Sequence, residues 1–335
     1  MVMIKELNYY YQKYPNSKIE DFFKLLYQKN FGSEHFIINE EKSYQLLIQE
    51  SKNINTHYYQ DLYEYIGQNY VRINLQPYLI NHFDLNLLNR FFIDSARPIK
   101  CKNAFIRDLN TLYDFLIENG FNQTEINEKF FTFRNLNYPP VHHSKIYRES
   151  YCPSYRVVNQ KYINDEFKFA QFTNYLRTLP TDKISLIAIE GKYGSGKTIL
   201  SMKAANELPV TVIHCNDFFD IEKESNIGIN SQRISQEIFA HIKIGKSLEY
   251  RKYDCYTNEY HNIIIEKVKP IVLIVGVYSA NPALITQYHS IIYFTINTEL
   301  QKRRIEEETF KKIWIPKENE YYQKYNVKYK SNIIV

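Results

Sequence analysis

The segment Gly191–Thr198 constrains the fold more than any other part of this 335-residue chain. Its sequence, Gly-Lys-Tyr-Gly-Ser-Gly-Lys-Thr, matches every fixed position of the pattern G-x-x-x-x-G-K-[ST]. An apolar run, Ile184–Ile189, precedes it, and a run of good helix formers, Ile199–Leu208, follows it. A glycine-rich turn between a buried strand and a helix N-terminus directs backbone N–H groups at an anion. We therefore predict a phosphate-binding loop at this position.

Each fixed residue of the loop has a predicted task. The glycines allow the backbone to turn around a β-phosphate, Lys197 reaches the β- and γ-phosphates, and the Thr198 hydroxyl binds Mg²⁺. The cofactors expected are therefore ATP, or a similar nucleotide, and Mg²⁺. The residues predicted to bind the cofactor are Gly191, Gly194, Ser195, Gly196, Lys197 and Thr198.

The second half of the chain alternates short apolar runs with helical runs. The apolar runs are Ile184–Ile189, Val210–Cys215, Ile271–Val277 and Ile291–Ile296. The helical runs are Ile199–Leu208, a segment near Ile234–Ile244, and Leu300–Glu308. Buried strands that alternate with helices predict a parallel sheet of the α/β class.

The first half instead predicts mainly helical structure. Ser17 followed by Glu20 is a capping-box signature, and the apolar periodicity that follows stops at Gly32. Tyr70–Leu75 alternates as a short strand does, and further helical runs cover Leu85–Ile93, Phe105–Ile117 and Asp165–Arg177. We predict a mainly helical domain at residues 1–158 and an α/β nucleotide-binding domain at residues 159–335.

Composition excludes several classes of partner. The net charge is +5, and no block of five or six basic residues marks a nucleic-acid or membrane-binding arm. No apolar segment has the length of a membrane span or the pattern of a signal peptide. Cys101, Cys152, Cys215 and Cys255 show no ligand or disulfide spacing. We expect a cytoplasmic protein that binds a nucleotide, with homo-oligomerisation left open.

Motifs after the loop resemble those of the uridine kinase-like nucleoside kinases. They appear in the same order and spacing, over roughly residues 182–335. They are Cys215–Phe219, Gly245, Tyr250–Cys255, Ile274–Ser279, Arg303–Ile305 and Trp314–Glu318. The resemblance implies a P-loop kinase-like fold and the transfer of a γ-phosphoryl group from ATP to a hydroxyl of a nucleoside or other small molecule.

The resemblance also implies roles for particular residues. Arg303 and Arg304 would form a lid over the triphosphate, where guanidinium groups offset the charge on the transferring phosphoryl. Tyr253 and Asp254 match a turn that lines the acceptor pocket. The predicted catalytic residues are Lys197, Asp217, Arg303 and Arg304, and the predicted metal ligands are Thr198 and Asp217.

Three acidic positions of the family are not acidic here. Asn216 stands where the family has the general base, Val275 where it has a glutamate near the metal, and Asn230 where an aspartate grips the ribose. Asp217 substitutes for the base only if the turn is rotated, since successive side chains point in opposite directions. Glu190, directly before the loop, is either a carboxylate near the metal or a structural cap. Two interpretations therefore stay open: an active phosphotransferase, or a weakened kinase-like domain whose ATP occupancy regulates the N-terminal domain.

The N-terminal half contains no catalytic motif. Its clearest polar cluster is His142-His143-Ser144. Adjacent histidines bind a metal, transfer protons or make a hydrogen-bonded loop, and the sequence leaves these alternatives open.

Overall fold

The computed structural model describes residues 2–32, 39–54, 61–67, 69–96, 103–219, 229–254, 257, 259–305 and 308–335. The chain divides into two compact units, Met1–Gln171 and Phe172–Val335. The division falls inside α9 (Asp165–Arg177), whose bounds are those of the predicted helix. The sequence placed a domain boundary after residue 158.

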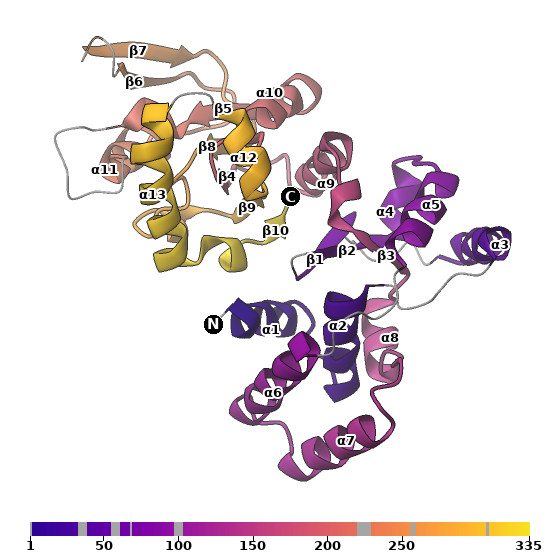
Figure 1. The fold of residues 1–335 in the computed structure, drawn as a ribbon. Coiled ribbons are helices and arrows are strands. Elements are labelled where there is room, and N and C mark those ends of the chain that lie inside the picture. Colours follow the sequence, from indigo (N-terminus) through magenta and orange to yellow (C-terminus); the bar gives the residue numbers. More distant parts are fainter. Residues whose placement is uncertain are drawn as a thin grey trace. The chain divides into compact units, whose positions relative to one another are not determined.

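The first unit is mainly helical, as predicted (Figure 1). Its helices before α9 are α1 (Val2–Lys13), α2 (Ile19–Phe31), α3 (Glu40–Ser51), α4 (Leu75–Ile80), α5 (Leu85–Ser95), α6 (Asn103–Glu118), α7 (Gln123–Asn135) and α8 (Lys145–Tyr151). A short 3-10 turn, η1 (Gln160–Tyr162), precedes α9. Helix α2 ends where predicted, because Gly32 adopts a positive φ of 70° and its N–H bonds to the Gln28 carbonyl.

The start of α2 differs from the predicted capping box. The N-terminal cap is Lys18, and its backbone N–H donates to the carboxylate of Asp21 rather than to Glu20. The Ser17 hydroxyl donates to the carbonyl of Tyr14 instead of capping the helix. Only the reciprocal half of a capping box is therefore present, one residue later than the sequence signature indicated, because a lysine side chain cannot accept a hydrogen bond.

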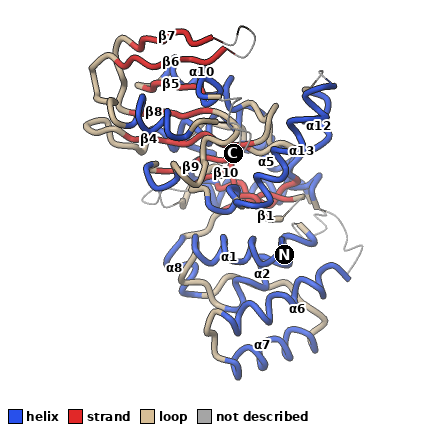
Figure 2. The backbone as a smooth tube through the Cα atoms, turned by 90° about the vertical axis from the view of Figure 1, so that its left-hand side faces the viewer, coloured by secondary structure: helices blue, strands red, loops and turns tan. Residues whose placement is uncertain are grey.

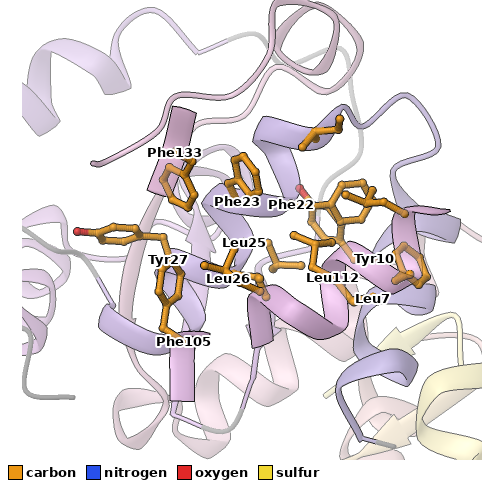
Figure 3. Close-up of a cluster of buried hydrophobic side chains, with 14 of the residues drawn as sticks. Leu7, Tyr10, Phe22, Phe23, Leu25, Leu26, Tyr27, Phe105, Leu112 and Phe133 are labelled. Carbon is orange, nitrogen blue, oxygen red and sulfur yellow. The ribbon is translucent and has the colours of Figure 1, made fainter. Parts of the chain in front are cut away.

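Aromatic side chains make the core of the first unit. Figure 3 shows residues of α1, α2, α6 and α7 meeting in this cluster. Phe22 and Phe105 are fully buried, and Phe23 stacks on Phe133 with ring centroids 4.4 Å apart. Burying one such side chain stabilises a fold by roughly 1.5–3 kcal/mol. The first unit thus has a hydrophobic core of its own.

A small antiparallel sheet, in the order β1-β2-β3, completes the first unit. Its central strand β2 (Tyr70–Asn74) confirms the predicted extended segment, whereas β1 (Tyr63–Ile66) and β3 (Tyr155–Asn159) were not predicted. Arg72 of β2 lies directly opposite Glu64 of β1, and both side chains are buried. Opposite charges at paired positions stabilise neighbouring strands.

The second unit contains the predicted parallel sheet, with five strands in the order β10-β9-β4-β8-β5. They are β4 (Ser185–Gly191), β5 (Val210–His214), β8 (Ile271–Val275), β9 (Ser290–Phe294) and the short β10 (Ile333–Ile334). All residues of β4, β8 and β9 are buried, as expected of strands covered on both faces. The strand before the glycine-rich loop, β4, is the central one.

Helices of the second unit follow the strands. They are α10 (Lys197–Glu207), α11 (Ser231–Arg233), α12 (Thr298–Arg304) and α13 (Glu308–Tyr325), with short helical segments η2 (Cys215–Phe218), η3 (Ile234–Phe239), η4 (Ile285–Gln287) and η5 (Val327–Lys330). Alternate strand residues pack with α13 and η3 on one face of the sheet, including Ala188, Ile274 and Tyr293 beside Tyr321 and Ile238.

A two-stranded hairpin that was not predicted, β6 (Leu248–Asp254) and β7 (Glu259–Ile265), lies beyond the β5 edge of the sheet (Figures 1 and 2). Among the described residues, no helix combines the length and apolar character needed to cross a bilayer. Cys152 and Cys215 are free thiols, while Cys101 and Cys255 lie outside the described residues.

Candidate functional site

The glycine-rich loop joins β4 to α10 in a conformation that requires glycine. Gly191, Gly194 and Gly196 all have positive φ, at 144°, 77° and 91°. A Cβ added at Gly191 would lie 2.4 Å from the carbonyl oxygen of Phe294, so a side chain there collides with backbone. Gly196 is also the N-terminal cap of α10, whose first residue is Lys197. The predicted strand–loop–helix arrangement is therefore present, with a helix N-terminus available to an anion.

Lys197 is buried inside this loop, with 6% of its surface exposed. Its Nζ donates to the carbonyl oxygen of Lys192 at 3.1 Å. Burial lowers the pKa of Lys197, while the negative charges of Glu190 and Glu318 act in the opposite direction. Thr198, on the first turn of α10, is exposed, and Ser195 is buried with a hydroxyl that has no hydrogen-bond partner among the described residues.

Helices α12 and α13 hold the tip of the loop through side chains. Arg304 donates to the carbonyl oxygen of Gly194 at 2.8 Å, and Gln301 donates to the carbonyl oxygen of Tyr193 at 3.1 Å. Glu318 accepts from the Tyr193 N–H at 2.8 Å and from Gln301 at 2.9 Å. The loop is thus braced by two elements more than 100 residues further along the chain.

The two arginines of the predicted lid lie differently. Arg304 reaches the loop, while Arg303 points to solvent with its side chain 76% exposed. Arg303 forms an ion pair with the exposed Glu299, with Nη2 and Oε2 3.9 Å apart. An exposed pair of this kind contributes little to stability.

Glu190 is a structural hub directly before the loop. Its carboxylate is fully buried and accepts from the backbone N–H groups of Gly191, Tyr278 and Ala280 at 3.0 to 3.2 Å. It also accepts from the hydroxyls of Tyr321 at 3.1 Å and Tyr322 at 2.7 Å. Burial raises the pKa of Glu190, and these hydrogen bonds act against that rise. The hydrogen bonds of Glu190 are those of a structural cap, which is one of the two alternatives left open by the sequence.

The turn after β8 lies beside this hub. Tyr278 has a positive φ of 72°, an uncommon backbone conformation for a bulky residue and one that is often found at functional sites. A Cβ added at Gly276, two residues before Tyr278, would lie 3.7 Å from the side-chain oxygen of Asn216. Asn216 is exposed at this edge, and Val275 is buried with 2% of its surface accessible.

Asp217 faces the hairpin rather than Gly276. Its Oδ2 accepts from the Tyr250 hydroxyl at 2.9 Å, and its Oδ1 lies 3.9 Å from Nζ of Lys252. Tyr253 and Asp254 are half-buried near the end of β6, and the Tyr253 ring lies 5.4 Å from that of Tyr260. The hairpin therefore contributes Tyr250 and Lys252 to Asp217, contacts that the sequence did not predict.

The predicted residues form two groups. The loop residues Gly191–Thr198 and Arg304 lie together, and Asp217 lies with the hairpin that carries Tyr253 and Asp254. Both groups follow the carboxyl ends of parallel strands, which is where open α/β sheets bind ligands. Arg303 joins neither group in the described part of the chain.

The donor set fits the phosphates of a nucleotide better than a free metal ion. Positive-φ glycines, a buried ammonium group and a helix N-terminus are groups that bind anions. In the part of the chain that the structure describes, no three His, Cys, Asp or Glu side chains are placed together to hold a metal ion. Mg²⁺ bound with a nucleotide takes most of its ligands from phosphate oxygens and water, so the exposed Thr198 hydroxyl fits the role predicted for it.

In the first unit, the histidine pair is split between surface and core. His142 is exposed, whereas His143 is buried between Asp21, 2.8 Å from Nδ1, and Tyr155, 2.7 Å from Nε2. Burial lowers the pKa of His143 to about 4, and the hydrogen bond to Asp21 acts against that change. The sequence left open a metal ligand, a proton-transfer group and a hydrogen-bonded loop residue, and His143 is hydrogen-bonded through both ring nitrogens.

The fold and the loop define the second unit as a P-loop kinase-like α/β domain. This follows from the central strand that ends in the G-x-x-x-x-G-K-[ST] loop and from the parallel strand order around it. The predicted fold class is confirmed, with a mainly helical unit before it.

Comparison with solved structures finds chains of low sequence identity that are similar to part of this one. The chain is similar to a candidate uridine kinase from Bacillus stearothermophilus, with 14% identity and a TM-score of 0.41, over 50% of this chain and 97% of that one. It is similar to a candidate fructose transport system kinase from a Silicibacter species, with 15% identity and a TM-score of 0.38, over 50% of this chain and 98% of that one. No protein-family model and no curated protein matches the chain.

Proposed function

We propose that the second unit is an ATP-dependent phosphotransferase that moves a γ-phosphoryl group to a hydroxyl of a nucleoside or another small molecule. The observation that carries this proposal is the position of Lys197. Its buried ammonium group lies at the junction of β4 and α10, inside a loop whose three glycines have positive φ. Its hydrogen bond is to the carbonyl of Lys192, so its charge is available to a phosphate.

The residues around the loop have distinct roles in the proposed transfer. Loop N–H groups and the N-terminus of α10 bind phosphate oxygens, and Lys197 offsets the charge of the β- and γ-phosphates. Arg304, which already touches Gly194, offsets charge on the transferring group. The Thr198 hydroxyl holds Mg²⁺, which supplies further positive charge to the phosphates when the nucleotide is bound.

In the transfer itself, the acceptor's hydroxyl oxygen forms a bond to the γ-phosphorus. The bond from that phosphorus to the bridging oxygen breaks, and ADP leaves with the electron pair. The hydroxyl proton passes to a base, for which Asp217 is the proposed carboxylate. The Tyr250 hydroxyl orients its Oδ2 through a hydrogen bond, and the ammonium group of Lys252 lies 3.9 Å from its Oδ1.

ATP consumption measured against a panel of nucleosides, sugars and other hydroxylated metabolites tests this function. We expect at least one acceptor to accelerate ADP formation and to gain a phosphate detectable by mass spectrometry, and Lys197→Ala to abolish both. A full-length protein that binds Mg²⁺·ATP but phosphorylates no acceptor would contradict the transferase proposal.

A second candidate function is a nucleotide-binding regulatory module for the first unit. It is favoured by Asn216, which is exposed next to Gly276 and has no basic oxygen at neutral pH. Such a module binds Mg²⁺·ATP without turnover. The same panel separates the two functions, because only the transferase yields a phosphorylated acceptor.

A further inference from the structure

Arg233, at the end of α11, is a buried arginine near Asp217 that the proposed transfer does not use. Only 7% of its surface is exposed. Its guanidinium carbon lies 5.1 Å from the ring centre of Phe218, the residue after Asp217, and 4.9 Å from the ring centre of Tyr260. Phe218 in turn stacks on Tyr250, with ring centroids 5.3 Å apart. Arg233 is therefore part of the group formed by η2 and the hairpin.

The guanidinium of Arg233 is fixed on one side only. Its Nε donates to Oε1 of Glu237 at 2.9 Å, and its Nη2 donates to Oε2 at 3.2 Å. Nη2 also donates to the carbonyl oxygen of Arg251. A guanidinium has five N–H donors in a rigid plane, and the two on Nη1 remain. Nη1 is buried and has no hydrogen-bond partner among the described residues.

An unpaired donor of this kind is unusual inside a protein. Buried polar atoms are nearly always hydrogen-bonded, and leaving one unpaired costs about 1–3 kcal/mol. Stacking and the Glu237 pair keep Arg233 from turning to another partner. Proteins often bind a carboxylate or phosphate oxygen with an arginine whose guanidinium is held in place and whose remaining N–H donors point to the oxygen.

The charges around Arg233 also favour an anion. Glu237 binds two arginines, because Nη2 of Arg251 also donates to its Oε1 at 2.6 Å. Burial acts to raise the pKa of Glu237, but the hydrogen bonds from Arg233 and Arg251 outweigh it and lower the pKa to about 2. Among the described residues, two guanidinium groups thus share one carboxylate, which leaves one positive charge. The neighbouring pair, Lys252 and Asp217, is balanced.

We infer that the phosphoryl acceptor carries an oxyanion, a carboxylate or a phosphate, in addition to its reacting hydroxyl, and that Nη1 of Arg233 binds that oxyanion. This inference rests on the proposed transferase function and narrows its substrate class. Asp217 would receive the hydroxyl while Arg233 holds the anion. Asp217 follows the carboxyl end of β5, at the same edge of the sheet as the glycine-rich loop, and Arg233 lies against the ring of the next residue, Phe218. Neutral nucleosides and sugars would leave Nη1 unpaired.

Matched acceptor pairs test this inference in the full-length protein. The pairs are ribose 5-phosphate with ribose, glucose 6-phosphate with glucose, and gluconate with sorbitol, so that each neutral partner lacks the oxyanion. We expect the anionic member of at least one pair to give a kcat/KM about 10- to 100-fold higher than its partner, since a site built for a polar group rejects analogues that lack it. The phosphate and carboxylate pairs show which oxyanion fits.

Substitution of Arg233 gives the second arm. Arg233→Met should raise the KM for the anionic acceptor about 10-fold or more while the affinity for ATP is unchanged, and Arg233→Lys should restore part of the loss. Arg177→Met, an exposed arginine in the same unit, is the matched control. If Arg233→Met does not fold, as judged by circular dichroism, the Arg233→Lys variant and the wild-type preference between pair members decide the question.

The outcomes separate this inference from the proposed function. Turnover of neutral acceptors with no preference for their anionic partners overturns the inference and leaves the transferase standing. If no acceptor is turned over, calorimetry with a non-hydrolysable ATP analogue and each pair decides. Binding of the anionic member alone supports the oxyanion site while the transferase fails, and binding of neither member overturns both.

Discussion

Nη1 of Arg304 donates to the carbonyl oxygen of Gly194 at 2.8 Å, so the last residue of α12 contacts the glycine-rich loop, as Gln301 of the same helix does. Arg303, the neighbour of Arg304 in sequence, extends into solvent. We therefore expect Arg304 to contribute more than Arg303 to phosphoryl transfer, although the sequence predicts the same role for both residues.

We predict that Arg304→Ala lowers kcat about 100-fold, because it removes a charged donor from the side of the triphosphate. Arg303→Ala is the control, and its effect should be less than about threefold, since an exposed arginine pairs only weakly with Glu299. Steady-state ATP consumption with the best acceptor measures both. Equal losses for the two variants would show that Arg303 also closes over the nucleotide.

Glu190→Gln should destabilise the second unit by about 1–3 kcal/mol. The carboxylate accepts from five donors, whereas glutamine offers one oxygen and places an NH₂ group against the remaining donors. Chemical denaturation of the variant measures the change, and Glu299→Gln, at an 88% exposed side chain, is the matched control. An unchanged free energy of unfolding for Glu190→Gln would contradict the role of this carboxylate as a hub.

The first unit should lose stability as the pH falls from 7 to 4. Burial holds the pKa of His143 at about 4, below its ordinary 6.5, so the unfolded chain takes up a proton that the folded chain refuses. Stability is therefore full above pH 6.5 and decreases by up to about 3 kcal/mol toward pH 4. Urea unfolding at several pH values should show this slope.

The exposed neighbour supplies the control for that slope. His142→Gln should keep it, and His143→Gln should remove most of it while lowering stability at pH 7, because His143 bridges Asp21 and Tyr155. A slope that persists in His143→Gln would assign the pH dependence to another group.

Asn216→Asp should increase phosphoryl transfer about 100-fold if position 216 faces the acceptor hydroxyl, since a carboxylate there can take up the proton. Asn216 lies at the exposed edge next to Gly276, while Asp217 is held by Tyr250. The rate of ADP formation with a saturating acceptor measures the effect. No change in Asn216→Asp, together with a large loss in Asp217→Asn, would support Asp217 as the proposed base and would contradict a position of residue 216 facing the acceptor hydroxyl.

Local pattern was sufficient for the loop, for strands β4, β5, β8 and β9 and for helix α10, whereas α13 and β10 were not predicted. A glycine-rich segment between a buried strand and a helix is specified by residues that are neighbours in sequence, so Gly191–Thr198 could be predicted. The hairpin β6–β7 could not, because its alternation of polar and apolar residues is weak and no two-residue turn signal joins its strands. Strands β1 and β3 are likewise short and far apart in sequence.

The braces of the site come from long-range contacts that leave no local signature. Glu190 meets Tyr322 across 132 positions, and Glu318 meets Tyr193 across 125. One signal was available: a charged residue at the end of an otherwise apolar strand needs hydrogen-bond partners when it is buried. The sequence therefore indicates that Glu190 needs hydrogen-bond donors. Only the tertiary structure identifies two of these donors as tyrosines of α13.

Calorimetric binding of Mg²⁺·ATP to the wild type, Lys197→Ala and Lys192→Ala tests the central claim most directly. Both lysines belong to the loop, but Lys192 bonds to Asn319 of α13 and Lys197 lies inside the turn. We expect Lys197→Ala to weaken binding at least about 30-fold and Lys192→Ala to bind nearly as the wild type does. Equal affinity of the wild type and Lys197→Ala would contradict a nucleotide site at this loop.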